Sequence, residues 1–264
     1  MDLQLDDKTA LVTGSTAGIG HAIATTLARE GARVVVNGRT DERVRAAQEA
    51  IRDAVPDADV DGVAADLSGA KGVNALTDAV PTLDILVNNV GIFEPKDFAE
   101  ITDDDWFRLF ETNVMSGVRL SRHFLPQMKE QGWGRIVFIS SESAVQIPEE
   151  MIHYGMTKSA QVSIARGMAE TTEGTGVTVN SVLAGPTASE GVTEFVKELA
   201  REQDLTPEAV EEQFFNTARP TSLLQRFIEP DEIAPLVAYL CSPQAVATNG
   251  AALRADGGVV RSML

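Results

Sequence analysis

Short apolar runs alternate along the chain with longer segments whose apolar residues recur every three or four positions. The short runs are nearly continuous in apolar residues, which is typical of strands buried on both faces of a sheet. They cover residues 9–14, 33–38, 60–66, 83–89, 134–141, 176–183 and 251–256, and the run at 60–66 is the weakest. Helical periodicity predicts helices over 18–30, 41–54, 103–130, 151–173 and 231–240, with two more inside 189–217.

Strands that alternate with helices predict a parallel sheet with helices on both faces. We therefore expect an α/β protein, a single-domain Rossmann fold whose doubly wound sheet has seven parallel strands. No linker rich in Gly, Ser or Pro divides residues 1–264, so one domain is expected. In such a sheet the carboxyl ends of the strands form the edge where ligands bind.

Charge and composition narrow the choice of partners and compartment. The chain has 39 acidic and 22 basic residues, a formal net charge of −17, which disfavours nucleic acid and anionic membranes as partners. Cys241 is the only cysteine, so no intrachain disulfide can form, and no His/Cys cluster has the spacing of metal ligands. The acidic N-terminus does not resemble a signal peptide, and no apolar run is long enough to span a membrane. We expect a cytoplasmic protein.

The stretch "TGSTAGIG", residues 13–20, joins the first strand to the first helix. Glycines allow a tight turn and a close approach of the backbone to a phosphate. The helix N-terminus offers free N–H groups and a partial positive charge to a pyrophosphate. Glycines also serve ordinary turns, but the strand–loop–helix context favours dinucleotide binding. The predicted contacts are Gly14, Ser15, Thr16, Gly18, Ile19 and Gly20.

The end of the second strand bears on the choice of cofactor. Folds that read NAD usually carry an Asp or Glu there, whereas this chain has "NGR" ending in Arg39. A charge-assisted hydrogen bond from Arg39 to a 2′-phosphate contributes about 1.5–3 kcal/mol, so NADP(H) is favoured and NAD(H) stays possible. Ala17 adds no second basic residue, and a solvated Arg39 is the alternative. Asp66 and Leu67 follow the third strand, where Asp66 either accepts from the adenine amino group or caps a helix.

The stretch "YGMTK" places Tyr154 and Lys158 one helical turn apart on one face. Ser141 ends the fifth strand, so the three side chains can meet at the carboxyl edge of the sheet. A tyrosine has an ordinary pKa of about 10, and a nearby ammonium lowers that pKa, which suits proton exchange with an alcohol or ketone. The alternative is a surface pair that adds about 0.2–0.5 kcal/mol to the helix. Asn113 is unusual inside a helix and marks either a kink or a site residue.

Taken together, the motifs resemble the short-chain dehydrogenase/reductase family over essentially the whole chain. They are "TGSTAGIG", "NNVG", "ETNV", "ISS", "YGMTK", "VNSVLAGPT" and "DGG", in the family's order. The resemblance implies an NADP(H)-dependent oxidoreductase that interconverts a carbonyl compound and a secondary alcohol, with Tyr154 as general acid/base. It further implies that Lys158 binds the nicotinamide ribose, that Ser141 holds the substrate oxygen and that Asn113 keeps a relay water.

The resemblance also implies further cofactor contacts. They are Asn89, Val90, Gly91, Gly185 and Thr187, besides Tyr154 and Lys158 themselves. Val90 replaces the family's usual alanine and is expected to crowd the cofactor slightly. Ala184 replaces a usual proline, which is expected to loosen a turn near the nicotinamide.

Residues 188–222 are expected to form a substrate lid by the same resemblance. Acidic residues outnumber basic ones there, which disfavours a highly anionic substrate and leaves a small or medium carbonyl compound or alcohol. Three alternatives remain open: a 3-oxoacyl-carrier-protein reductase-like enzyme, for which Lys129 and Arg135 are the local basic residues, a non-catalytic NADP(H)-sensing regulatory protein, and an isomerase or lyase. The family resemblance implies a homotetramer, with a dimer as the alternative. His153 is expected at the surface or at the mouth of the pocket.

Overall fold

The computed structural model describes residues 2–263, and within them seven strands form one parallel sheet. The spatial order is β3-β2-β1-β4-β5-β6-β7, so the chain moves outward from β1 in one direction and then from β4 in the other. The loops after β1 and β4 therefore diverge at one point of the carboxyl edge, where open α/β sheets bind ligands. The strands are β1 (Thr9–Val12), β2 (Arg33–Gly38), β3 (Val60–Ala64), β4 (Ile85–Asn88), β5 (Gly134–Ser141), β6 (Val177–Ala184) and β7 (Ala252–Ala255).

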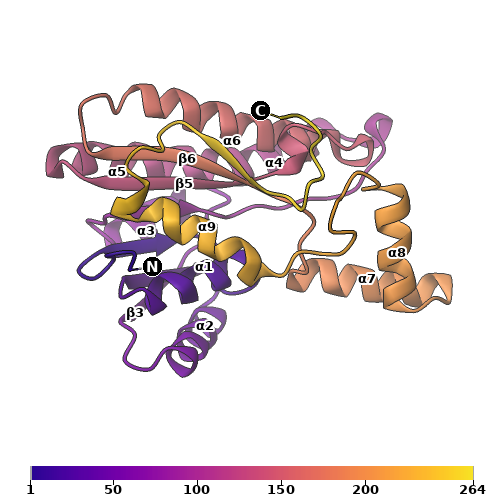
Figure 1. Cartoon of the computed structure of the whole chain (residues 1–264), viewed down its shortest axis with the longest axis horizontal. Coiled ribbons are helices and arrows are strands. Elements are labelled where there is room, and N and C mark those ends of the chain that lie inside the picture. The colour runs from indigo at the N-terminus through magenta and orange to yellow at the C-terminus, as the bar shows by residue number, and fades with distance from the viewer. Residues whose placement is uncertain (1, 264) are drawn as a thin grey trace.

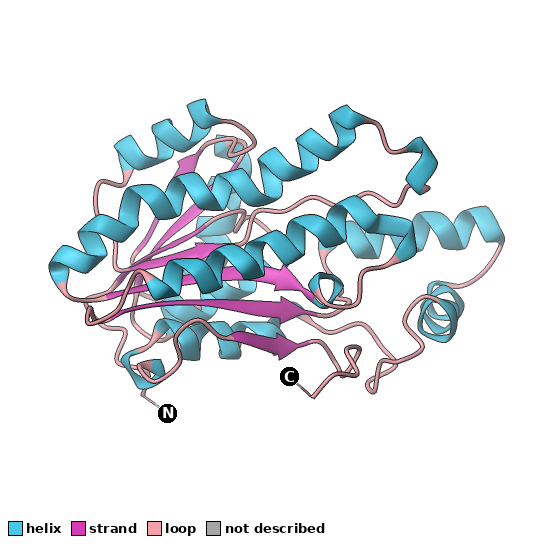
Figure 2. Ribbon diagram, turned by 90° about the horizontal axis from the view of Figure 1, so that it is seen from above, coloured by secondary structure: helices cyan, strands magenta, loops and turns pink. Residues whose placement is uncertain are grey.

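Helices cover both faces of the sheet, as Figures 1 and 2 show. One core lies under α1 (Gly18–Arg29), α2 (Asp41–Ala54) and α9 (Pro230–Cys241), and the other under α3 (Ala70–Ala79), α5 (Ser116–Gln131) and α6 (Ile152–Glu170). Successive residues of β1 contribute to opposite cores, because side chains alternate along a strand. The predicted α/β fold and its seven-stranded parallel sheet are confirmed.

The predicted helix over 103–130 is interrupted. It consists of α4 (Asp103–Phe110), a π-helical turn at Glu111–Met115, and α5. Asn113 lies inside this turn, so the unusual asparagine does mark an irregularity of the helix. Pro126 lies inside α5 near its end, as expected.

Helix α3 was not predicted. Only Val73, Leu76 and Thr77 are buried in it, and Gly72 lies in its first turn, so its periodic signal is weak. Its N-cap is Gly69, which makes the alternative of Asp66 as the helix cap wrong. Asp66 instead accepts a hydrogen bond from the Ser68 backbone N–H at 3.0 Å.

The segment between β6 and α9 carries α7 (Glu190–Gln203) and α8 (Pro207–Thr217), which confirms the two helices predicted inside 189–217. Both project from the carboxyl edge of the sheet, at the right of Figure 1. An isolated parallel bridge pairs Thr187 with Ile228, and the Ala188 N–H donates to the Ile228 carbonyl at 2.9 Å. This segment, which contains the residues 188–222 predicted as a substrate lid and is called the lid below, therefore begins and ends at one place.

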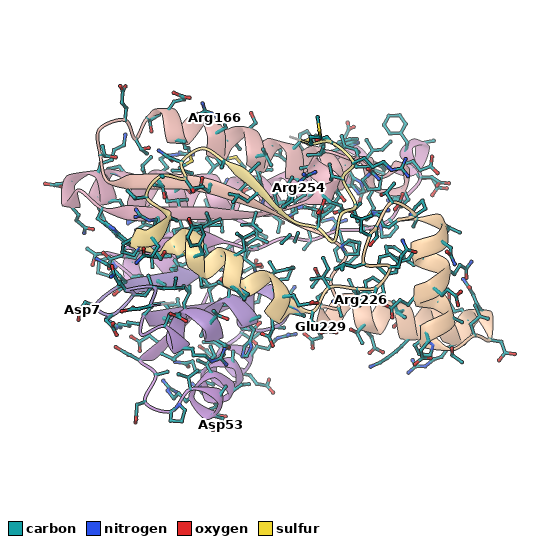
Figure 3. All side chains as sticks on the ribbon, viewed as in Figure 1. Asp7, Asp53, Arg166, Arg226, Glu229 and Arg254 are labelled. Carbon is teal, nitrogen blue, oxygen red and sulfur yellow. The ribbon has the colours of Figure 1, made fainter. Side chains whose placement is uncertain are left out.

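Charged side chains such as Asp53 and Arg166 lie at the periphery of the molecule (Figure 3). Among residues 2–263, no helix combines the length and the apolar character that crossing a bilayer requires. In the same part of the chain, no three His, Cys, Asp or Glu side chains are grouped so that they could hold a metal ion.

Candidate active site

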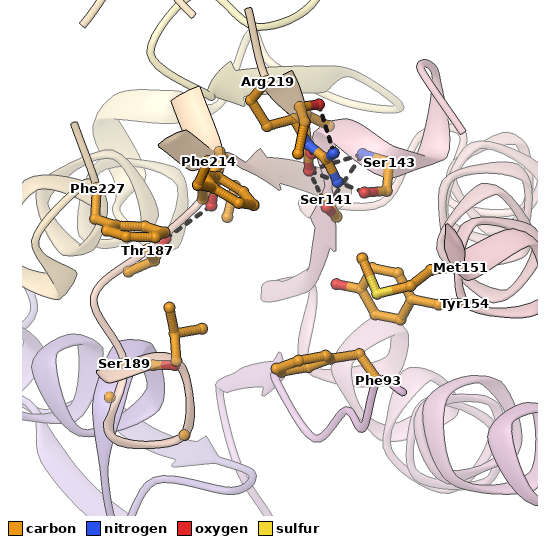
Figure 4. Close-up of a pocket in the computed structure, with 18 of the residues that line it drawn as sticks. Phe93, Ser141, Ser143, Met151, Tyr154, Thr187, Ser189, Phe214, Arg219 and Phe227 are labelled. Atoms are coloured by element: carbon orange, nitrogen blue, oxygen red, sulfur yellow. Dashed lines mark hydrogen bonds and ion pairs between the residues drawn. The ribbon is translucent and has the colours of Figure 1, made fainter. Parts of the chain in front are cut away.

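A cavity of about 630 Å³ opens at the carboxyl edge of the sheet, between the glycine loop and the lid. Its wall combines residues that the sequence predicted for the cofactor with residues predicted for catalysis. Those in the wall are Gly18, Ile19, Gly20, Asn89, Gly91, Ser141, Tyr154, Lys158, Gly185 and Thr187. The predicted residues that are not part of the wall are Gly14, Ser15, Thr16, Arg39, Asp66, Leu67, Val90 and Asn113. Figure 4 shows Ser141, Tyr154 and Thr187 around the cavity.

The glycine loop needs its glycines. Gly14 and Gly18 have φ of +60° and +54°, which side chains rarely adopt, and a Cβ at Gly20 would lie 2.5 Å from the Gly14 carbonyl oxygen. The Asn89 amide donates to the Thr13 and Gly14 carbonyls at 2.9 and 3.1 Å and so ties the loop to the end of β4. The N-cap residue of α1, Ala17, makes no capping hydrogen bond with its side chain, and the first turn of the helix faces the cavity. This cradle fits a pyrophosphate.

Asn37, the residue before Gly38 at the end of β2, was not predicted to matter. Its side-chain oxygen accepts from the Gly14 N–H at 3.2 Å, and its amide donates to the Val63 and Ala65 carbonyls at 3.1 and 3.2 Å. The buried amide therefore fixes the glycine loop to both β2 and β3. The available signal was a neutral asparagine, followed by Gly38 and Arg39, where NAD-binding folds usually carry a carboxylate.

Arg39 lies exposed beyond the end of β2. Hydrogen bonds from Ser68 lower the pKa of Asp66, and the Arg39 charge adds to this effect, so Arg39 and Asp66 are electrostatic neighbours. Arg43 in the first turns of α2 pairs with Glu190 at the start of α7 at 2.6 Å, which brings a second basic residue to this region. The Leu67 side chain is buried in the core under α3.

Val90 and Gly91 follow β4. The Val90 side chain packs against Gly14, because its Cγ2 lies 3.1 Å from where a Gly14 Cβ would be. Gly91 faces Lys158, whose Nζ would lie 3.2 Å from a Cβ at that position. The valine side chain at position 90 thus packs against the glycine loop at Gly14.

Ser141, Tyr154 and Lys158 converge on the cavity, as predicted. The Lys158 Nζ donates to the Ile139 carbonyl at 3.0 Å and lies 5.6 Å from the centre of the Tyr154 ring. The Ser141 hydroxyl donates to the Glu142 carboxylate and accepts from the Ser143 N–H at 3.1 Å. The Glu142 carboxylate, directly after β5, therefore accepts the hydrogen bond of the Ser141 hydroxyl.

The protein groups move the pKa of Tyr154 in the direction opposite to the predicted one. Burial raises the Tyr154 pKa above its ordinary value, and the Glu142 charge adds to the rise. A hydrogen bond with Ser141 and the Arg219 charge act in the opposite sense. Burial also lowers the pKa of Lys158 to about 8, which Glu142 partly offsets. The prediction counted the lysine charge and omitted desolvation.

Asn113 joins α6, the helix that carries Tyr154 and Lys158, to the loop after β4. Its side chain accepts from the Ile92 N–H at 2.8 Å and donates to the Ile92 carbonyl at 2.9 Å and the Thr157 hydroxyl at 3.0 Å. Its backbone carbonyl accepts from Gln161 at 2.6 Å. The π-helical turn thus presents both the side chain and the backbone of Asn113 to neighbouring elements.

His153 is fully buried and does not line the cavity, so its expected place at the surface or pocket mouth is wrong. Its ring packs edge-on against Trp106 at 5.8 Å between centroids. Within residues 2–263, neither ring nitrogen has a hydrogen-bond partner. The apolar wall of the cavity comes instead from Phe93, Met151, Phe214 and Phe227.

Comparison with known proteins agrees with this geometry. A family profile described as short chain dehydrogenase matches residues 8–200. The chain is 51% identical over 263 residues to an uncharacterised oxidoreductase of Bacillus subtilis, YvaG, with 100% of both chains covered. It is 32% identical to a 3-oxoacyl-[acyl-carrier-protein] reductase of Aquifex aeolicus, covering 98% of this chain and 100% of the other. The crystal structure of L-sorbose reductase from Gluconobacter frateurii, complexed with NADPH and L-sorbose, matches with a TM-score of 0.93 at 30% identity over 100% of both chains.

Proposed function

The chain belongs to the short-chain dehydrogenase family of oxidoreductases, and we propose that it transfers hydride between NADP(H) and a small or medium carbonyl compound or secondary alcohol. One observation carries the proposal: Ser141, Tyr154 and Lys158 line the same cavity as the glycine loop. NADPH in the related L-sorbose reductase supports the choice of cofactor.

The bound cofactor would supply or accept the hydride at the substrate carbon. Tyr154 gives a proton to the carbonyl oxygen or takes one from the hydroxyl, and Ser141 orients that oxygen. With a pKa of about 8, Lys158 is mostly charged at neutral pH and binds ribose hydroxyls beside the Tyr154 ring. The proposed cofactor contacts are those predicted from the sequence, with Arg39 on the 2′-phosphate. Asn113 keeps the helix of Tyr154 in register, and a relay water on Asn113 remains a prediction.

The proposal is tested by following NADPH oxidation with a panel of ketones and aldehydes. Tyr154→Phe should lower kcat/KM by about 10²–10⁴-fold, because the phenolic proton is lost while the ring stays. Tyr239→Phe is the matched control, since Tyr239 lies in α9 outside the cavity wall. Equal activity of the two variants would contradict the role of Tyr154. An inactive wild type that still binds NADPH would favour a sensing protein instead.

The cofactor preference is tested at Arg39. Arg39→Ala should weaken NADPH binding by about 10- to 100-fold and leave NADH binding nearly unchanged, because only NADPH carries the 2′-phosphate. Arg45→Ala removes the same charge from the exposed side of α2 and serves as the control. An equal loss for both cofactors in Arg39→Ala would rule out the phosphate contact.

A second candidate is reduction of acyl chains on a carrier protein, favoured by the 32% identity to such a reductase. The structure weakens it at Arg135, whose buried guanidinium donates to the Ser242 and Gly176 carbonyls and so does not face a partner. Comparing a 3-oxoacyl group on carrier protein with the same group on a small thiol separates the candidates. A carrier-protein enzyme would show a much higher kcat/KM for the protein-bound form.

We also propose that the protein self-associates, as a homotetramer. The exposed side chains of Phe107 and Phe110, one turn apart on α4, support an interface, because soluble monomers rarely expose several large apolar side chains together. Light scattering coupled to size exclusion measures the mass, and a monomer at micromolar concentration would contradict the proposal.

A further inference from the structure

A buried ion pair joins the lid to the end of β5. Glu142 follows Ser141 directly, and Arg219 lies just beyond α8. The Arg219 Nε lies 2.9 Å from a Glu142 oxygen, and the two side chains are only 7% and 5% exposed. Figure 4 shows Arg219 reaching toward Ser141 and Ser143. Taking both charges out of water is costly, so a buried pair is poor support for stability alone and suggests another use.

The Glu142 carboxylate is held from several sides. One oxygen faces Arg219, and the other accepts from the Ser141 hydroxyl, from the Ser143 N–H at 2.8 Å and from the Ser143 hydroxyl at 3.1 Å. These donors fix the carboxylate in one orientation, because they come from the end of β5, from the turn after it and from the lid. The carboxylate in turn fixes the hydroxyl of Ser141 in the cavity wall.

Charged groups from three segments lie near Tyr154, and a fourth charge pairs with one of them. Glu142 comes from the turn after β5, Arg219 from the lid, and Lys158 from the same helix as Tyr154. Glu150, in the turn before α6, lies 3.1 Å from the Arg219 Nη1 and shares that guanidinium. A negative charge disfavours the phenolate and a positive charge favours it, so Glu142 and Arg219 act on Tyr154 in opposite directions.

We propose that Glu142 and Arg219 are positioning residues for proton transfer: Glu142 orients Ser141 and sets the charge beside Tyr154, and Arg219, carried by the lid, balances that charge. The lid then influences how readily Tyr154 exchanges its proton. The link to turnover rests on the proposed function. The effect of the two charges on the phenol does not, and it can be measured without any substrate.

The chain has only two tyrosines, so a Tyr239→Phe background leaves Tyr154 as the single phenol. Titrating the tyrosinate absorbance in this background reports Tyr154 alone. Glu142→Gln should lower the midpoint by about one pH unit, and Arg219→Gln should raise it. The double variant should return close to the background, and Arg219→Lys, which keeps the charge, should stay there.

A purely structural role predicts a different outcome. Both single variants would then loosen the lid, expose Tyr154 and shift the midpoint in the same direction, and the double variant would shift it as far or further. That result would overturn the proposal. If Arg219→Gln does not fold, as judged by circular dichroism, then Glu142→Gln, the double variant and Arg219→Lys still decide: an unchanged midpoint in Glu142→Gln overturns it.

The kinetic test follows kcat/KM for alcohol oxidation against pH in the same variants. The acidic limb should move to lower pH in Glu142→Gln and to higher pH in Arg219→Gln, because oxidation needs the ionised phenol. Limbs that do not move would overturn the link to proton transfer. If the wild type oxidises no alcohol and reduces no carbonyl compound, the proposed function fails, while the titration still decides the charge pair.

Discussion

The two ends of the cavity are held by different kinds of interaction. At the glycine loop, neutral amides of Asn37 and Asn89 bond backbone groups of β3 and of the loop itself. At the lid, an ion pair between Arg219 and Glu142 and a stack of Phe214 on Phe227, 5.2 Å between centroids, make the contact. Neutral amides add no charge to the cavity, whereas the ion pair places two charges near Tyr154. The glycine-loop end is thus held by neutral hydrogen bonds, and the Arg219 end is held by charge.

The largest expected effect separates two ion pairs of the lid. Arg219→Gln leaves the buried carboxylate of Glu142 without its partner and should lower the free energy of unfolding by about 3–5 kcal/mol. Arg43→Gln breaks the exposed pair with Glu190 and should cost less than about 1 kcal/mol, with a cost that falls further in salt. Urea denaturation measures both. Similar costs for the two variants would show that burial does not distinguish the lid contacts.

A smaller effect tests the steric requirement at the other end. Gly20→Ala places a Cβ 2.5 Å from the Gly14 carbonyl oxygen and should lower the free energy of unfolding by about 3 kcal/mol and abolish NADPH binding. Gly167→Ala in α6 meets no atom within 4 Å and should raise stability by about 0.5–1 kcal/mol. Thermal unfolding and cofactor titration read both variants, and tolerance of alanine at position 20 would disprove the tight cradle.

The smallest effect concerns pH. Burial lowers the pKa of His153, Asp105 and Glu94 act in the opposite sense, and the charges of Arg108 and Lys96 add to the lowering. The unfolded chain then binds the proton more readily than the folded one, so this contribution to stability is complete above the ordinary histidine pKa of about 6.5 and is lost as the pH falls below it. His153→Phe should flatten this decline, and His123→Asn, which changes an exposed histidine, should not. An unaltered decline in His153→Phe would place the sensitivity elsewhere.

Local patterns predicted the strands well, because each is a short apolar run with turn residues at its ends. The convergence of Ser141, Tyr154 and Lys158 was also predictable, because a strand end and the first turn of a helix determine where those side chains can lie. Helix α3 escaped detection, since three buried positions give too little periodicity.

Other features depend on contacts distant in the sequence. Arg219 contacts Glu142, which lies 77 residues earlier in the chain, and no residue close to position 219 in the sequence indicates a carboxylate partner. Asn37 bonds the glycine loop and the end of β3 at the same time, and this can be seen only once the order of the strands in the sheet is known. His153 packs against Trp106 on α4, which is distant in the sequence, so the burial of His153 could not be predicted from its neighbours in the chain. The predicted direction of the Tyr154 pKa shift was wrong for the same reason, because desolvation depends on the residues that the folded chain brings around the phenol.

The bridge between Thr187 and Ile228 gives the lid a modular character. Because both ends of the excursion are pinned by backbone hydrogen bonds at 2.8–2.9 Å, the rest of the fold experiences it as a closed loop of adjustable length. We expect that the segment between Thr187 and Ile228 can be replaced by that of a relative, provided that this bridge is kept and Glu142 finds a new cation. Protein engineering would then change this segment and leave the glycine loop as it is.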